Sequence, residues 1–351
     1  MDMTFFIFLS SGLFLGWSLG ANDASNVFGT AVGTKMVSFK TAAVIASLFI
    51  TAGAVYAGAG ASETLGELGS INTLPGAFMA AFAAAISLYW MARNGLPVST
   101  SQAIVGAIIG WNIFADKPTH PEILSKIVST WIICPLLSGI IAVILYFFIR
   151  MLIRRSHLHI LRQDSYTRFG LIVAGAFGAY ALGANNIANV MGVFVPSSPF
   201  TNLDLGYDLV LTGTQQLFLI GALAICVGVF TYSHHVINTV GNNLMRMSPL
   251  VAFVVVLSQS IVLFLFASKS LEHFLLSHNL PALPLVPVSS TQAVIGAVMG
   301  IGLAKGGREL NWNILGHVAL GWIVTPIAAA LVCYISLFFL QNVFGQIVFL
   351  P

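Results

Sequence analysis

Residues 97–110 read Pro-Val-Ser-Thr-Ser-Gln-Ala-Ile-Val-Gly-Ala-Ile-Ile-Gly, and residues 287–300 repeat them as Pro-Val-Ser-Ser-Thr-Gln-Ala-Val-Ile-Gly-Ala-Val-Met-Gly. The two copies are identical at eight of fourteen positions, and the other six are exchanges between similar residues. Each copy opens with a proline, Pro97 or Pro287, followed by three hydroxyl residues and an apolar run. Proline is typical of the first turn of a helix, and Ser or Thr of its N-cap. The repeat therefore predicts two helix starts of the same design.

A helix start directs free backbone N–H groups and the positive end of the helix dipole at whatever lies before it, so it favours an anion. Three hydroxyl donors from each start suit a tetrahedral oxyanion, although plain helix capping would use the same residues. The next residues, Gln102 and Gln292, offer either an oxygen to a cation or an NH₂ group to the anion. The hydroxyl residues are Ser99, Thr100, Ser101, Ser289, Ser290 and Thr291.

The composition indicates where these helices lie. Only 7% of the 351 residues are charged, 58% are hydrophobic, and the mean hydropathy is +0.94. Soluble domains carry about a quarter charged residues. The sequence therefore predicts an all-α polytopic membrane protein whose surface contacts membrane lipid. No basic patch is interleaved with aromatic residues, so nucleic acid is not an expected partner.

A second polar motif lies in apolar surroundings near the N-terminus. Residues 20–27 read Gly-Ala-Asn-Asp-Ala-Ser-Asn-Val, and residues 183–190 match them at five of eight positions as Gly-Ala-Asn-Asn-Ile-Ala-Asn-Val. A carboxylate inside a membrane costs several kcal/mol and usually serves an ion pathway. We expect Asp23 to bind Na⁺ or carry a proton, whereas Asn186 occupies the equivalent position in the second copy. The motif is also predicted to interrupt its helix at mid-depth.

These motifs divide the candidate residues into two groups. No further metal, cofactor or catalytic residue is expected. Besides the six hydroxyl residues, the anion is assigned Asn22, Asn185 and Asn186. The coupling cation or proton is assigned Asp23, Asn26, Asn189, Gln102 and Gln292.

The motifs also divide the chain. We expect a first transmembrane repeat over 1–149, a basic cytoplasmic connector over 150–168, and a second, inverted repeat over 169–351. Broken or re-entrant helices of the two repeats should meet at the bilayer midplane, an arrangement typical of secondary transporters. Whether 97–115 and 287–304 cross or re-enter is left open. Further predicted spans are 41–61, 75–92, 127–149, 209–231, 249–268 and 314–340, and predicted loops include 62–74 and 196–208.

Basic residues set the expected orientation. With the N-terminus outside and five crossings per half, eleven Lys and Arg residues fall inside, Arg93 and Arg246 among them, and three fall outside. The positive-inside rule then predicts a multi-pass plasma (inner) membrane protein with both termini outside.

The paired motifs resemble the inorganic phosphate transporter (PiT) family over essentially the whole chain. The resemblance implies cation-coupled uptake of a tetrahedral oxyanion through inverted repeats, and a homodimer formed through small-residue faces. By motif matching it implies a shared anion and cation site lined by Asp23, Asn26, Ser99, Ser101, Ser289 and Thr291.

Two departures from the family pattern are similar to its sulfate permease branch: Asn186 in place of a second Asp, and the short connector. Hydrogen phosphate can donate its proton to a carboxylate, whereas sulfate has none and needs a donor such as the Asn186 NH₂ group. We therefore expect a symporter that imports sulfate, with a phosphate:Na⁺ or phosphate:H⁺ symporter as the alternative. An oxyanion channel is a more distant alternative. No nucleophile–base pair lies in the repeated motifs, so an enzyme is not expected.

Overall fold

The computed structural model describes residues 3–93, 98–156, 159–204, 206, 210–233, 247–308 and 310–350. Pro97 and Arg246 lie outside the described residues. The described chain is almost entirely helical, with one short antiparallel pair of strands. In chain order the elements are α1 Met3–Gly33, α2 Phe39–Ala57, α3 Ala59–Gly69, α4 Leu74–Arg93, α5 Thr100–Phe114, α6 Pro121–Ser156, α7 Ile160–Met191, a 3₁₀ helix Gly192–Ser197, β1 Leu203–Asp204, β2 Val210–Leu211, α8 Gly213–Thr231, α10 Pro249–Ala267, α11 Lys269–Ser277, α12 Ser290–Ala304 and α13 Trp312–Asn342.

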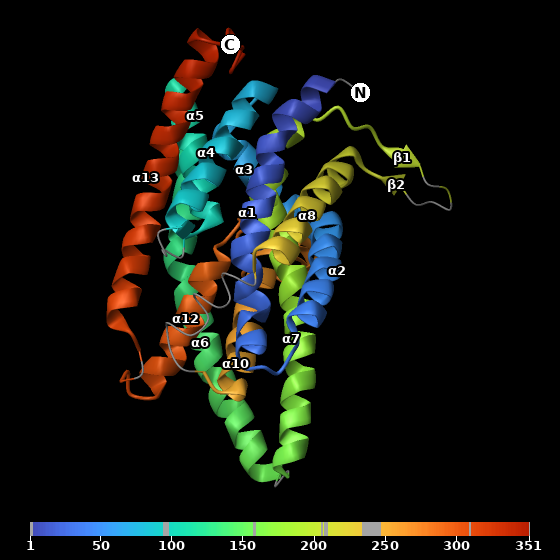
Figure 1. The fold of residues 1–351 in the computed structure, drawn as a ribbon, viewed down its shortest axis with the longest axis vertical. Coiled ribbons are helices and arrows are strands. Elements are labelled where there is room, and N and C mark those ends of the chain that lie inside the picture. The colour runs from blue at the N-terminus through green and yellow to red at the C-terminus, as the bar shows by residue number, and fades with distance from the viewer. Residues whose placement is uncertain are drawn as a thin grey trace.

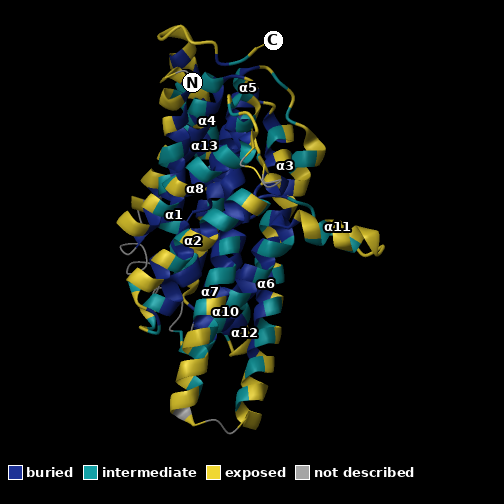
Figure 2. Cartoon of the chain, turned by 90° about the vertical axis from the view of Figure 1, so that its right-hand side faces the viewer, coloured by how far each residue is buried: buried dark blue, intermediate teal, exposed yellow. Residues whose placement is uncertain are grey.

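Eight helices in the described ranges are long and apolar enough to cross a membrane. The surface of α6 agrees, because Ile132, Leu136, Ile140 and Ile144 follow one another along one face and are 59% to 64% exposed. Ser138 on the same helix is fully buried. A helix that faces lipid needs this arrangement, with apolar side chains on its outer face and polar side chains directed into the bundle. The protein is therefore a multi-pass membrane protein, with its buried residues along the middle of the bundle (Figure 2).

The two halves of the chain repeat each other's helix contacts. Helix α1 packs on α8 as α7 packs on α2, α5 packs on α13 as α12 packs on α6, and α4 packs on α1 as α10 packs on α7. Figure 1 shows that α1 begins at the end of the molecule where both termini lie, whereas α7 begins at the opposite end, at the α6–α7 turn. The two halves therefore run in opposite directions, and the predicted all-α fold with inverted repeats is confirmed.

Helices α5 and α12 are the half-helices of this fold. Each has fifteen residues, or about 22 Å at 1.5 Å per residue, less than the roughly 30 Å of bilayer hydrocarbon. In Figure 1, α5 runs from the middle of the molecule toward the end that carries the termini, and α12 runs from the middle toward the other end. Each of the two repeated Pro-Val-Ser elements therefore supplies a half-helix that begins at mid-depth.

Glycines hold both half-helices against long helices of the other repeat. A Cβ atom at Gly106 of α5 would overlap the backbone oxygen of Pro326 in α13. In the same way, a Cβ atom at Gly296 of α12 would overlap the backbone oxygen of Pro135 in α6. Only a residue without a side chain permits these approaches, which fix the position of both helix starts.

The predicted interruption of the first helix at its polar motif is wrong. Helix α1 is continuous from Met3 to Gly33, and α7 runs through residues 183–190. Side chains in the motif form hydrogen bonds without disturbing the backbone; for example, Ser25 Oγ donates to the Asn22 carbonyl at 2.5 Å. Because the polar groups find partners within the bundle, the helix needs no break at this point.

Four connecting segments also differ from expectation. The predicted loop 62–74 is helical as far as Gly69, because α3 occupies Ala59–Gly69 and ends at Ser70 in a left-handed conformation with φ 41°. The amphipathic helix α11 and the β1–β2 pair were not predicted, since both are short and exposed. In the expected connector 150–168, α6 continues to Ser156 and α7 begins at Ile160.

Candidate functional site

The starts of α5 and α12 meet in the middle of the bundle. Ser101 Oγ donates to the Val288 carbonyl at 3.2 Å, and Thr291 Oγ1 donates to the Val98 carbonyl at 3.4 Å. These two contacts are equivalent, because each joins the third residue of one hydroxyl triplet to the extended residue that precedes the other helix. The expectation that the two helix starts face each other is confirmed.

The first residue of each triplet is a helix cap. Ser99 and Ser289 have extended backbones, and their hydroxyls accept the backbone N–H groups of Gln102 and Gln292 at 3.3 Å and 3.2 Å. The capping role that the sequence left open is thus observed for these two serines. The remaining hydroxyls, together with the free N–H groups of each first turn, are left for other partners.

Helix α1 brings its polar motif to the start of α12. The Asn26 amide nitrogen donates to Ser290 Oγ at 3.1 Å and to Thr291 Oγ1 at 3.2 Å. Asp23 is 2% exposed, accepts a 2.9 Å hydrogen bond from Asn22, and is also hydrogen-bonded by Ser290. Within the described ranges the ion pairs are Arg168–Asp164 and Lys269–Glu63, so no basic side chain there is paired with Asp23. A buried carboxylate in this setting suits a cation.

Helix α7 makes the corresponding contacts with the start of α5. Asn189 donates to Ser101 Oγ at 2.9 Å and to Asn186 Oδ1 at 3.0 Å. Asn185 donates to the Val288 carbonyl at 2.6 Å, and its Oδ1 accepts the Val288 backbone N–H at 3.0 Å. Each motif helix therefore contacts the half-helix of the other repeat.

Several buried polar atoms around this contact have no hydrogen-bond partner in the described chain. They are Thr100 Oγ1, Gln102 Oε1, Asn186 Nδ2, Asn189 Oδ1, and both amide atoms of Gln292. Buried polar groups in proteins are nearly always hydrogen-bonded. Donors and acceptors left over at two opposed helix starts are therefore what a small charged ligand would use.

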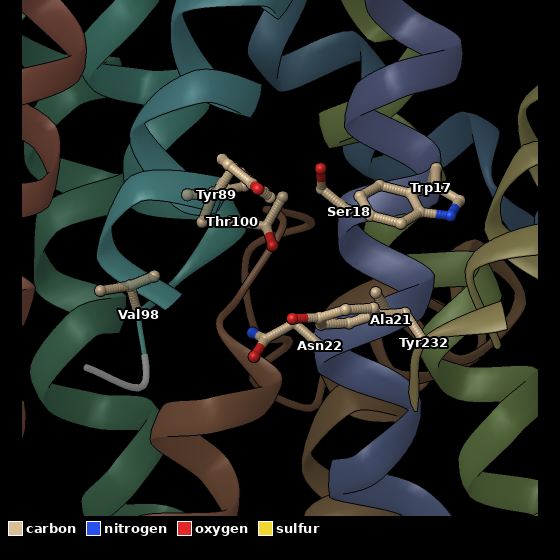
Figure 3. A pocket seen from close by; sticks show the side chains of 9 residues that line it. Trp17, Ser18, Ala21, Asn22, Tyr89, Val98, Thr100 and Tyr232 are labelled. Carbon is tan, nitrogen blue, oxygen red and sulfur yellow. The ribbon is translucent and has the colours of Figure 1, made fainter. Parts of the chain in front are cut away.

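The two sides of the site differ in one respect. Asn185 holds the backbone of Val288, whereas its counterpart Asn22 is half-buried and lines a pocket with Val98 and Thr100. Figure 3 shows the side chains of Asn22 and Thr100 extending into the space between their helices. Three aromatic residues, Trp17, Tyr89 and Tyr232, line the same pocket. The Asn22 side is therefore the more open of the two.

Sequence reasoning missed Gln259 on α10. Its side chain is fully buried, and its amide nitrogen donates to the backbone carbonyl of Asn26 at 2.5 Å. A sequence signal was present, because Ser258-Gln259-Ser260 interrupts an otherwise apolar span. The three polar residues lay outside the repeated motifs and for that reason were not selected.

An inverted-repeat membrane bundle with two opposed half-helices is typical of transporters. The Phosphate transporter family matches residues 19–333, and the chain belongs to this family. The protein named "Putative phosphate permease" of Methanocaldococcus jannaschii is 26% identical over 322 residues, with 92% of this chain and 93% of the relative covered. A protein of the same name from Haemophilus influenzae is 25% identical, with coverage of 95% and 96%.

A solved structure, "The sodium-dependent phosphate transporter", has the same fold, with a TM-score of 0.73, 21% sequence identity, and coverage of 97% of this chain and 99% of that chain. The resemblance to the phosphate transporter family is thus confirmed. The expected likeness to the sulfate permease branch is not supported, because these relatives carry phosphate names.

Proposed function

We propose that this protein imports inorganic phosphate together with Na⁺. The observation that carries the proposal is the meeting of two opposed helix starts beside a buried carboxylate, Asp23, which has no basic partner among the described residues. The names of the curated relatives and of the solved structure favour phosphate and sodium over the expected sulfate.

The anion is held without Arg or Lys. Two helix dipoles and the N–H groups of both first turns face it, and hydroxyls of the triplets donate to its oxygens. Thr100 has an unpartnered hydroxyl, and Asn186 an unpartnered NH₂ group, at this place. These groups replace the water molecules that the anion leaves behind.

The cation is held by Asp23. A carboxylate that faces the same helix start as the anion would repel it, unless a cation lies between the two charges. Binding of Na⁺ therefore favours binding of phosphate and the reverse, which is the thermodynamic coupling that a symporter needs.

Orientation and location follow from the basic residues. Arg154 and Arg155 lie at the α6–α7 turn, at the end of the molecule opposite both termini (Figure 1). By the positive-inside rule, these residues support a cytoplasmic turn with both termini outside, in what we take to be a plasma (inner) membrane. The proposal keeps the first repeat at 1–149, the connector at 150–168 and the second repeat at 169–351.

Sulfate remains the second candidate substrate, because Asn186 presents an NH₂ donor where the first repeat has a carboxylate. Uptake of radiolabelled phosphate into proteoliposomes with an inward Na⁺ gradient tests both. Uptake that excess phosphate blocks and excess sulfate leaves unchanged supports the proposal, and the reverse pattern replaces phosphate by sulfate. Absence of accumulation against a concentration gradient would instead indicate an oxyanion channel.

A further inference from the structure

Gln259 presents an unpartnered acceptor next to the polar motif of α1. Its NH₂ group donates to the Asn26 carbonyl, and since a carbonyl only accepts, the orientation of the amide is fixed. The other atom, Oε1, is buried and has no hydrogen-bond partner in the described chain. An acceptor with two lone pairs in a fully buried side chain calls for a cation or a hydrogen-bond donor.

The surroundings of Gln259 favour a cation. It contacts the turn of α1 that carries Asn26, and Asp23 lies three residues earlier on the same helix. Thr291 donates to Val98, so its hydroxyl accepts from Asn26, which leaves the Asn26 amide oxygen for another partner. Carboxylate and amide oxygens are the ligands that hard cations prefer.

The other repeat lacks both the carboxylate of Asp23 and the side-chain amide of Gln259. Helix α4 contains Ala77-Phe78 and Ile86, and α10 contains Ala252-Phe253 and Ile261 at the same spacing, 175 residues later. In this register Gln259 corresponds to Ala84, as Asp23 corresponds to Asn186. Ala84 is fully buried. The two repeats thus differ at two positions, Asp23 against Asn186 and Gln259 against Ala84. At both positions the additional oxygen ligand belongs to the side of the site that contains Asp23.

From this geometry we propose that Gln259 Oε1 is a ligand of the coupling cation, in a site shared with Asp23 and Asn26. The equivalent position beside Asn186 and Ala84 has neither a carboxylate nor a second carboxamide side chain from the neighbouring helix, so in the described chain this set of ligands occurs on the Asp23 side. The proposal rests on the proposed Na⁺-coupled function and adds to it a residue outside the repeated motifs.

The test compares three single variants of the full chain in proteoliposomes. Gln259→Leu removes the oxygen, Gln259→Glu keeps an oxygen but removes the NH₂ donor, and Ser258→Ala is a matched control. Ser258 is buried on the same helix, and within the described residues its hydroxyl donates to the Val255 carbonyl in the preceding turn. The readouts are the Na⁺ concentration at half-maximal phosphate uptake and the phosphate KM at saturating Na⁺.

We expect Gln259→Leu to raise the half-saturating Na⁺ concentration about tenfold or more, since loss of one charge-assisted ligand is worth at least a factor of ten. The phosphate KM at saturating Na⁺ should stay near the wild-type value. Ser258→Ala should keep a wild-type Na⁺ dependence, and Gln259→Glu, which retains an oxygen ligand, should not raise the half-saturating Na⁺ concentration. A purely structural role through the Asn26 contact predicts instead that Gln259→Glu is as impaired as Gln259→Leu.

An unchanged Na⁺ dependence in Gln259→Leu overturns the assignment of this ligand. If Gln259→Leu cannot be purified, Gln259→Glu decides, because a raised half-saturating Na⁺ concentration in that variant also overturns it. A wild-type protein that takes up phosphate with no response to Na⁺ rejects the proposed function itself, which is a separate outcome.

Discussion

The amide nitrogen of Asn189 on α7 lies 2.9 Å from the hydroxyl of Ser101 on α5, a contact between residues 88 positions apart in the sequence. Its counterpart joins Asn26 on α1 to Thr291 on α12 at 3.2 Å. Each polar motif thus holds the helix start of the opposite repeat. A ligand bound between the two helix starts contacts both repeats at once, and the predictions below use this arrangement.

Asp23→Asn should abolish Na⁺-driven accumulation of phosphate, because the neutral amide cannot balance the charge of a bound cation. Accumulation in proteoliposomes under a Na⁺ gradient is the measurement. Asp164→Asn is the matched control, since Asp164 is 49% exposed on α7 and pairs with Arg168 at the surface. Undiminished gradient-driven accumulation in Asp23→Asn would contradict the role of this carboxylate.

Thr100→Val should weaken phosphate binding without loss of stability. The Thr100 hydroxyl is buried and has no protein partner, so its removal breaks no hydrogen bond within the described chain. We expect the phosphate KM to rise about tenfold, corresponding to one lost hydrogen bond to a charged ligand. An unchanged KM would mean that this hydroxyl does not face the anion.

Ser99→Ala should lower stability more than Thr100→Val does, because the Ser99 hydroxyl caps α5 by accepting the Gln102 backbone N–H. Loss of an N-cap typically costs about 1 kcal/mol of stability. Thermal unfolding in detergent should show a lower midpoint for Ser99→Ala than for Thr100→Val. Equal midpoints would argue against the division into capping and binding hydroxyls.

Asn185→Ala should destabilise the protein more than Asn22→Ala. Asn185 makes two hydrogen bonds to the Val288 backbone, whereas Asn22 donates to Asp23 and lines a pocket. The buried Val288 N–H would be left unpaired, at about 1–3 kcal/mol, whereas the Val288 carbonyl would keep the hydrogen bond from Ser101. Thermal midpoints of the two variants measure this difference, and a larger loss for Asn22→Ala would show that the two sides are not related as described.

Gly106→Val should prevent close packing of α5 on α13, because its side chain would overlap the Pro326 carbonyl. Overpacking of this kind typically costs about 1–3 kcal/mol. Gly316→Ala on α13 is the control, since a Cβ atom there meets nothing within 4 Å. Size-exclusion profiles and thermal midpoints should show a loss for Gly106→Val alone.

Labelling of single introduced cysteines tests the proposed orientation of the protein in the membrane. In a variant whose three native cysteines are replaced, Ser156→Cys lies at the α6–α7 turn and Asn342→Cys at the end of α13, and both positions are exposed. An impermeant maleimide added to intact cells should label Asn342→Cys, and Ser156→Cys only after permeabilisation. The reverse pattern would place the basic end outside.

Sequence repetition predicted the architecture because both motifs occur twice and inverted repeats follow from an odd number of crossings per half. The polar motif of α1 was wrongly predicted to break its helix, because the sequence does not reveal that Asn26 has partners on another helix. Hydrogen bonds between helices decide whether a polar residue in a span breaks it, and these depend on tertiary contacts.

The candidate site residues were also predicted because they occur in both repeats, which explains why Gln259 was missed. Gln259 has Ala84 as its counterpart, so a search for duplicated polar residues passes over it. The division of each triplet into a capping serine and two hydroxyls with other roles was also beyond the sequence, since both uses require the same residue types.

The glycine contacts Gly106–Pro326 and Gly296–Pro135 have a mechanical consequence. Each contact packs a half-helix closely against a long helix of the other repeat. The two repeats therefore cannot rotate relative to each other as separate rigid bodies without separating these backbones. Any rigid body that keeps these contacts combines helices of both repeats, either α5 with α13 or α12 with α6.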